Sequence, residues 1–232
     1  MQAIKLDIDG ASVDALLGVP DGSGLFPGIL IAHHQEGLSP FTRDLAAKLT
    51  QLGYAVICPD NYHRCRPEDD LATRRNSIID SVVTHELGVA LNVLKRHPGV
   101  RGDRLAIVGH CMGGRTALLA ASALQDIRAA VIFYPTALYV KRASGTAAFD
   151  ELDGIACPVI GFFGDTDRLI PPEHADRFEA ALRGRHVPLE MHRYPDAGHA
   201  FCNFTSAADY REGPAADSWR HATAFLERHL RS

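Results

Sequence analysis

The chain has 232 residues, of which 46% are hydrophobic and 22% charged, and its formal net charge at pH 7 is -4. This balance excludes the basic surface that nucleic acids require and a polybasic arm for membranes. No apolar run reaches the roughly 18 residues of a membrane-spanning helix. Residues 1–20 lack the charged and apolar regions of a secretory signal, and the five cysteines show no CxxC spacing. We therefore expect a cytoplasmic protein with reduced thiols.

The first elements are a ribbon, a buried strand and a helix. Ile4–Ile8 and Asp14–Val19 alternate apolar and polar residues around an Asp-Gly turn, which predicts an antiparallel β-ribbon. Gly28–Ala32 is short and continuously apolar, as buried parallel strands are. Ser39–Leu52 is expected to be a helix, because it starts with a capping serine and a proline and is followed by a glycine.

The same alternation continues to the C-terminus. Further strands are expected at Tyr54–Pro59, Leu105–Gly109, Ala129–Tyr134, Pro158–Phe163 and Leu189–Tyr194. Helices are expected between the polar stretch Asn61–Asp70 and His97, over Gly113–Leu124, from Pro172 to Leu182, and over Pro214–Leu230. The small residues of Lys141–Asp150 predict a surface loop. Alternating strands and helices favour an α/β fold, with a mostly parallel sheet, helices on both faces, and a single domain over residues 1–232.

The most informative motif is Gly109-His110-Cys111-Met112-Gly113, between an apolar strand and an Ala-rich helix. Glycines at both flanks suit a sharp strand-to-helix turn that has no room for side chains. The pattern is that of the nucleophile elbow of the α/β-hydrolase fold, with cysteine in place of serine. The helix N-terminus favours a thiolate at Cys111, and the N–H of Met112 can face an oxyanion. A buried packing cysteine at a tight turn is the alternative interpretation.

His199 is the expected general base. It lies in a Gly-flanked loop after the last expected strand, at the sheet edge where open α/β folds bind ligands. The chain has 12 histidines, but His199 also follows both the nucleophile and the acid, which is the chain order of this fold.

Two carboxylates follow the strand before His199. Asp165 suits an organising role in its own turn. Asp167 lies further out, where its carboxylate can orient the imidazole and stabilise the imidazolium. We expect Asp167 to be the acid.

With these residues in place, the chain resembles the dienelactone hydrolase (carboxymethylenebutenolidase) family, nearly from end to end. The motifs that carry the resemblance are Gly109–Gly114, Gly164–Pro171 and Ala197–Phe201. Cysteine at the elbow is the discriminating feature, since most α/β hydrolases have serine there. The resemblance implies a Cys111, His199 and Asp167 triad that hydrolyses an activated ester or enol-lactone through a thioester, without a cofactor.

In that family a glutamate after the third strand helps to generate the thiolate. Matching the Gln35-Glu36 pair directly gives this role to Glu36, whereas a gap-free match anchored on Arg43 puts His34 at the position. Both assignments stay open. In either case the N–H of Met112 and a backbone N–H near Gln35 are expected to form the oxyanion hole.

Family members that take dienelactone hold its carboxylate with two arginines. Asn203 stands where one of them would follow His199, and Arg74 or Arg75 is the candidate for the other. Asparagine provides hydrogen bonds without charge, which weakens a bidentate clamp. The substrate is therefore expected to be a neutral or differently shaped ester.

The expected partner is a small-molecule ester or lactone, with no nucleic acid and no membrane; monomer and dimer both stay open. No metal is expected, because the adjacent His33 and His34 would point to opposite faces of a strand. Two alternative functions remain: a broader carboxylesterase or thioesterase of the same fold, and a non-hydrolytic binding or thiol-sensing protein that keeps the fold, with Cys111 as a redox-reactive residue. The presence of Asp167 and His199 favours an enzyme over the sensor.

Overall fold

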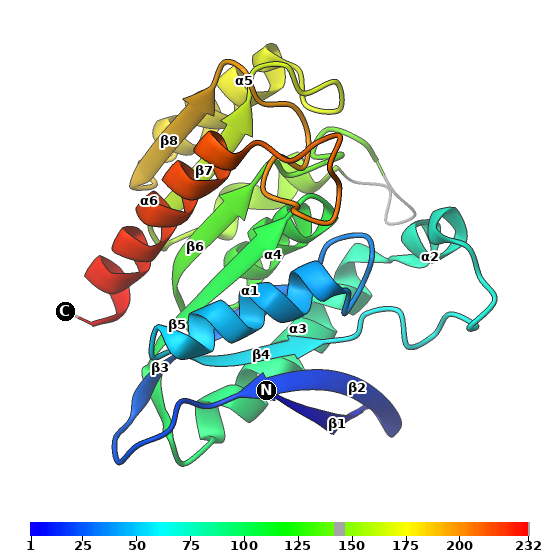
Figure 1. Ribbon diagram of the computed structural model, residues 1–232, viewed down its shortest axis with the longest axis vertical. Helices are drawn as coiled ribbons and strands as arrows, with labels where there is room; N and C mark the ends of the chain where they lie inside the picture. The colour runs from blue at the N-terminus through cyan, green and yellow to red at the C-terminus, as the bar shows by residue number, and fades with distance from the viewer. Residues whose placement is uncertain (142–146, 232) are drawn as a thin grey trace.

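The computed structural model describes residues 1–141 and 147–231 (Figure 1). Within these residues the strands form one eight-stranded sheet, in the order β1-β2-β4-β3-β5-β6-β7-β8. The strands are β1 (Gln2–Ile8), β2 (Ala11–Gly18), β3 (Phe26–Ala32), β4 (Ala55–Pro59), β5 (Val100–His110), β6 (Ile127–Phe133), β7 (Val159–Gly164) and β8 (Leu189–Tyr194).

The N-terminal ribbon forms one edge of this sheet. β1 pairs antiparallel with β2, and β2 pairs antiparallel with β4. Asp9 and Gly10 join the two strands with φ angles of 54° and 82°, the positive values that a tight hairpin turn requires. The other neighbouring strands pair in parallel. The predicted ribbon and mostly parallel sheet are confirmed.

Helices cover both faces of the sheet. They are α1 (Pro40–Gln51), α2 (Leu71–Ser77), α3 (Asp80–Arg96), α4 (Met112–Ala123), the 3-10 helix η1 (Ala148–Gly154), α5 (Pro172–Gly184) and α6 (Glu212–Leu230). Figure 1 shows α1 and α6 in front of the sheet, and α3 and α4 behind it. This layering is the α/β architecture that the alternating pattern predicts.

The segment before His97 differs from its prediction as one helix. It forms α2 and α3, separated by Ile78 and Ile79, whose backbones are extended. Ile78 is buried whereas α2 has no buried residue, so the chain turns where an apolar side chain enters the core. Among the described residues no single helix is long and apolar enough to cross a membrane, and only the bent pair of α2 and α3 meets that criterion by length and composition.

The predicted loop Lys141–Asp150 falls partly outside the described residues, which exclude 142–146. Of its described part, Lys141 pairs with Ala147, and Ala148 begins η1. The prediction of a loop is therefore wrong for the last residues of this segment.

The core lies on both faces of the central strands. Every residue of β4 and β7 is buried, as are all residues of β3 after Phe26. Such strands are continuously apolar because helices cover both of their faces. The carboxyl ends of the parallel strands lie along one edge, and the segments that follow β3, β4, β5, β7 and β8 carry the candidate site residues.

Candidate active site

Cys111 lies on the sharp turn between β5 and α4. Its φ and ψ angles are 56° and -122°, a region that costs about 1–3 kcal/mol for a residue with a side chain. A Cβ atom at Gly109 would collide with the carbonyl of Gly113, and one at Gly113 would collide with the carbonyl of Ala32. The two glycines are therefore needed for the helix to start so close to β3 and β5.

The Cys111 sulfur faces a histidine from another loop. Its Sγ lies 3.1 Å from His199 Nε2 and 4.0 Å from Thr136 Oγ1. Cys111 is only 8% exposed, and its backbone N–H donates to the carbonyl of Phe133 at 3.0 Å. The thiol is thus held at the start of α4, where the helix has N–H groups without intrahelical acceptors.

His199 connects this sulfur to a carboxylate. Its Nδ1 lies 2.8 Å from Oδ2 of Asp167, on the opposite side of the ring from Cys111. Burial alone lowers the pKa of His199, but hydrogen bonds to Asp167 and Cys111 and the charges of both groups outweigh it and raise the pKa to about 10. The site therefore favours an imidazolium between two acceptors.

Asp167 and Asp165 have different partners. Oδ1 of Asp167 accepts the backbone N–H groups of Leu169 at 2.7 Å and Ile170 at 3.1 Å, which leaves Oδ2 for His199. Asp165 instead accepts from Nε of Arg193 at 2.6 Å. The geometry therefore places Asp167, rather than Asp165, against the imidazole.

The segment after β3 is held by His33. Its Nδ1 donates to the carbonyl of His34 at 2.7 Å, and its Nε2 accepts the backbone N–H of Asn61 at 3.0 Å. Burial lowers the pKa of His33 more than its hydrogen bonds and Asp60 raise it, so the ring is neutral. A trans peptide points its N–H opposite to its C=O, and fixing the His34 carbonyl therefore also fixes the direction of the Gln35 N–H.

His34 and Glu36 lie beside each other in this segment. Nε2 of His34 is 2.7 Å from Oγ of Ser39 and 4.0 Å from Oε2 of Glu36. Burial, with a smaller contribution from His33, lowers the pKa of His34 to about 4. No hydrogen bond or ion pair in the described chain joins either residue to Cys111.

Tyr62 is a site residue that the sequence analysis missed. Its hydroxyl donates to the carbonyl of Gln35 at 2.9 Å and lies 3.6 Å from the sulfur of Met112. It thus connects the two residues whose N–H groups are expected to bind an oxyanion. The only sequence signal was a polar stretch after β4, which does not reveal a contact over 27 positions.

The three candidates for substrate binding have different positions. Oδ1 of Asn203 accepts the N–H and hydroxyl of Thr205 at 3.1 and 2.7 Å, so this oxygen stabilises its own turn. Arg74 donates to two carbonyls of the loop before α2. Arg75 lies 3.4 Å from Oε1 of Gln35, and Arg74 lines a pocket together with Gln35 and Glu36, so both arginines reach the segment after β3.

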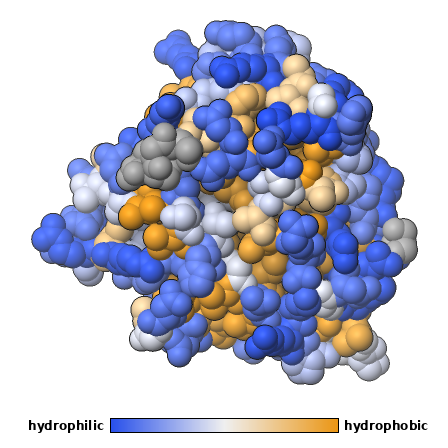
Figure 2. All heavy atoms as spheres, turned by 180° about the vertical axis from the view of Figure 1, so that it is seen from behind, coloured by the Kyte–Doolittle hydropathy of each residue, from blue (hydrophilic) through white to orange (hydrophobic). Residues whose placement is uncertain are grey.

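Part of the molecular surface is apolar. Four exposed hydrophobic residues come from α2, from the α2–α3 break and from the loops after β6 and β7: Leu71, Ile79, Val140 and Leu169. Figure 2, which views the molecule from behind Figure 1, shows hydrophobic patches among the hydrophilic surface. In the described chain no group of three metal-ligating side chains could hold an ion.

The fold and the strand-turn-helix geometry at Cys111 define the class of the protein as an α/β hydrolase. The profile of the Dienelactone hydrolase family matches residues 13–230. The chain belongs to this family of hydrolases.

Individual relatives agree with this assignment. The chain is 31% identical to a candidate carboxymethylenebutenolidase of Salmonella typhimurium, over 91% of this chain and 81% of that protein. It is 28% identical to a candidate 2-oxo-3-(5-oxofuran-2-ylidene)propanoate lactonase of Bradyrhizobium, over 99% and 95% of the two chains. The crystal structure of a candidate dienelactone hydrolase of Klebsiella pneumoniae superposes with a TM-score of 0.91, at 27% identity and 98% coverage of both chains.

Proposed function

We propose that this protein hydrolyses activated esters or enol-lactones by transferring the acyl group to Cys111. The observation that carries the proposal is the continuous chain of contacts from the Cys111 sulfur to His199, at 3.1 Å, and on to Asp167, at 2.8 Å. The protonated His199 and the N-terminus of α4 both place positive potential at this sulfur. This arrangement suits nucleophilic catalysis.

The reaction has two steps. The Cys111 thiolate attacks the carbonyl carbon, the N–H groups of Met112 and Gln35 stabilise the oxyanion, and His199 gives its proton to the leaving oxygen. A thioester remains on Cys111. His199, now neutral and oriented by Asp167, takes a proton from water as the water attacks the thioester. This releases the acid and restores the thiolate and imidazolium.

The substrate class follows from the nucleophile and from the charges near it. A thiolate suits leaving groups that depart readily, such as enolates and phenolates, so alkyl esters and amides are poor substrates. Arg74 and Arg75 both lie near Gln35, whereas Asn203, on the side of His199, carries no charge. The substrate therefore needs no carboxylate held between two arginines. The Bradyrhizobium relative, by contrast, is named for a lactone that carries a carboxylate.

The proposal is tested by steady-state hydrolysis of an enol-lactone, an aryl ester and an ethyl ester. Cys111→Ala should lower kcat on the first two by about 10³-fold or more, because removal of a nucleophile abolishes the covalent route. Cys65→Ser is the matched control, since Cys65 is a free cysteine whose sulfur contacts Ser77, 3.1 Å away. Hydrolysis retained in Cys111→Ala would refute the proposal.

A further inference from the structure

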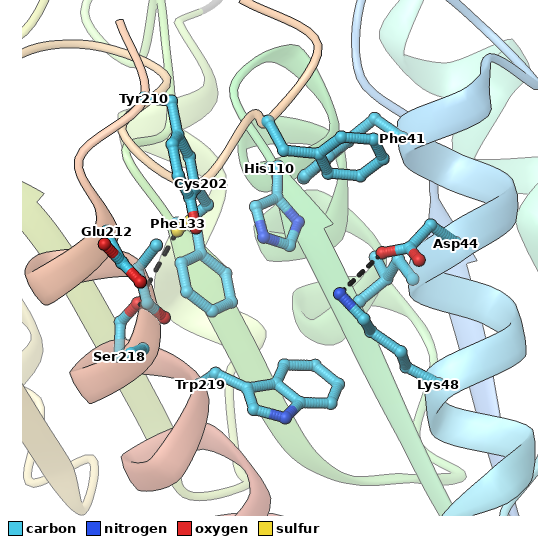
Figure 3. A pocket seen from close by; sticks show the side chains of 14 residues that line it. Phe41, Asp44, Lys48, His110, Phe133, Cys202, Tyr210, Glu212, Ser218 and Trp219 are labelled. Carbon is cyan, nitrogen blue, oxygen red and sulfur yellow. Dashed lines mark hydrogen bonds and ion pairs between the residues drawn. The ribbon is translucent and has the colours of Figure 1, made fainter. Parts of the chain in front are cut away.

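A cavity of about 440 Å³ lies between α1 and α6 (Figure 3). Its floor is formed by the ends of β5 and β6, and its principal lining residues are Phe41, Lys48, His110, Phe133, Phe204 and Trp219. Cys111, Asp167 and His199 do not line it. The volume falls in the range of small-molecule sites.

His110 presents a polar group to this cavity. Its ring stacks on Phe133 with a centroid distance of 4.0 Å and an interplanar angle of 7°, and Phe41 meets it edge-on at 5.1 Å. Figure 3 shows the imidazole between these two rings, among the residues that line the cavity. His110 is 5% exposed, and neither ring nitrogen has a hydrogen-bond partner among the described residues. Because His110 lines the cavity, its ring nitrogens are available to hydrogen-bond with a molecule that enters it.

The protonation state of His110 limits the kind of ligand. Burial, with a smaller contribution from His34, lowers the pKa of His110 to about 3. The neutral ring therefore offers one donor and one acceptor at pH 7, and no charge. It can bond to a hydroxyl or a carbonyl, but it provides no counter-ion for a carboxylate.

The charged residues around the cavity disfavour anions. Nζ of Lys48 lies 2.8 Å from Oδ2 of Asp44, so these two charges cancel. Glu212 also lines the cavity and makes no ion pair with another described residue. The charge that remains at the cavity is negative, and it repels an acidic ligand.

We propose that this cavity binds a planar aromatic compound that carries an uncharged hydroxyl or carbonyl, with the ring among the aromatic side chains and the polar group on His110. Aromatic walls favour a flat ring by stacking and edge-to-face contacts. The site does not depend on the proposed hydrolytic function, because no catalytic candidate contributes to its lining.

Trp219 makes this proposal directly measurable. It is the only tryptophan of the chain, and it lines the cavity, so its fluorescence reports on occupancy. We expect 4-methylphenol to change the emission of the wild-type chain saturably at pH 7. The matched anion, 4-methylbenzoate, should bind at least about 10-fold more weakly, because it meets Glu212 and a neutral imidazole.

Three variants locate the bound phenol. His110→Phe keeps the aromatic stack but removes the ring nitrogens, and should weaken binding about 3- to 10-fold, the effect of one hydrogen bond. Ala216→Phe adds a side chain at an exposed position of α6 that lines the cavity, and should abolish binding. Ala224→Phe is the control, since Ala224 is an exposed residue of the same helix outside the cavity.

Binding should also persist in Cys111→Ala, because Cys111 does not line the cavity. The proposal is overturned if 4-methylphenol gives no saturable change, or if Ala216→Phe responds like Ala224→Phe. It is equally overturned if 4-methylbenzoate binds as tightly as the phenol. Loss of the response in Cys111→Ala would also overturn it, since the probe would then bind at the nucleophile.

Discussion

At the residue scale, the site depends on backbone groups whose directions are set by side chains. The Gln35 peptide N–H has its direction fixed through the His34 carbonyl, which accepts from His33 Nδ1 and from the Gly37 N–H at 3.0 Å. Tyr62 holds the next carbonyl along the chain. His33 is therefore a positioning residue of the proposed oxyanion hole, and it acts through the peptide that it holds.

His33→Phe tests this role. The substitution keeps the ring but removes both of its hydrogen bonds, so the His34 carbonyl keeps only the Gly37 N–H and the Gln35 N–H is held less firmly. We expect kcat to fall about 10- to 100-fold, less than the loss of a whole oxyanion donor, with KM changed less than about 3-fold. Steady-state kinetics on an aryl ester measures both constants, and a thermal melt checks the fold. An unchanged kcat in a folded variant would exclude the positioning role.

At the element scale, a buried ion pair fixes the helix that carries the nucleophile. Arg115, in the first turn of α4, is fully buried and makes two hydrogen bonds to Asp80, the first residue of α3. Its Nε also donates to the carbonyl of Ala137 at 3.2 Å. The pair therefore joins α3, α4 and the loop after β6 behind the Cys111 turn.

Arg115→Met should destabilise the protein by about 3–5 kcal/mol, because Asp80 would be left buried without a partner. Adding Asp80→Leu should recover most of this loss, since two apolar side chains replace the pair. Urea denaturation of the two single variants and the double variant gives the coupling free energy. Additive losses would show that the two side chains do not act as a pair.

The elements themselves were largely predictable, and their contacts were not. Strong periodicity and terminal signals located the N-terminal ribbon, the elbow strand and α4. The break at Ile78 was missed because no proline or glycine marks it, and it is burial of this isoleucine that separates α2 from α3. Cys111, Asp167 and His199 were expected from motifs, and the structure brings them together. The contacts of His33 with Asn61 and of Tyr62 with Gln35 join segments 28 and 27 positions apart, and no local pattern encodes them.

At the scale of the whole molecule, buried histidines make the stability depend on pH in two directions. His34 and His110 have pKa values of about 4 and about 3, lowered chiefly by burial. Below about pH 6.5 the unfolded chain therefore binds more protons than the folded chain, and the free energy of unfolding decreases as the pH falls. His199 has the opposite shift, to about 10, so its stabilising contribution is complete below about pH 6.5 and is lost as the pH rises toward 10.

We therefore predict that the free energy of unfolding is greatest near pH 6.5. On either side of this pH it should fall by up to about 1.4 kcal/mol per pH unit for each histidine that is protonated in one state and neutral in the other. Urea denaturation at acidic, neutral and alkaline pH measures the curve. His110→Phe should flatten the acidic side, and His199→Gln the alkaline side. A stability that rises steadily from neutral to alkaline pH would contradict the assignment of His199.

The most direct test of the account is the mass of the acyl-enzyme. Wild-type protein mixed with an aryl ester and quenched in acid within the burst phase should carry one acyl group, which peptide mapping assigns to Cys111. Cys111→Ala should carry none, and His199→Gln should acylate more slowly. Turnover without an adduct, or an adduct on another residue that forms at the rate of turnover, would contradict the central claim that Cys111 is the nucleophile.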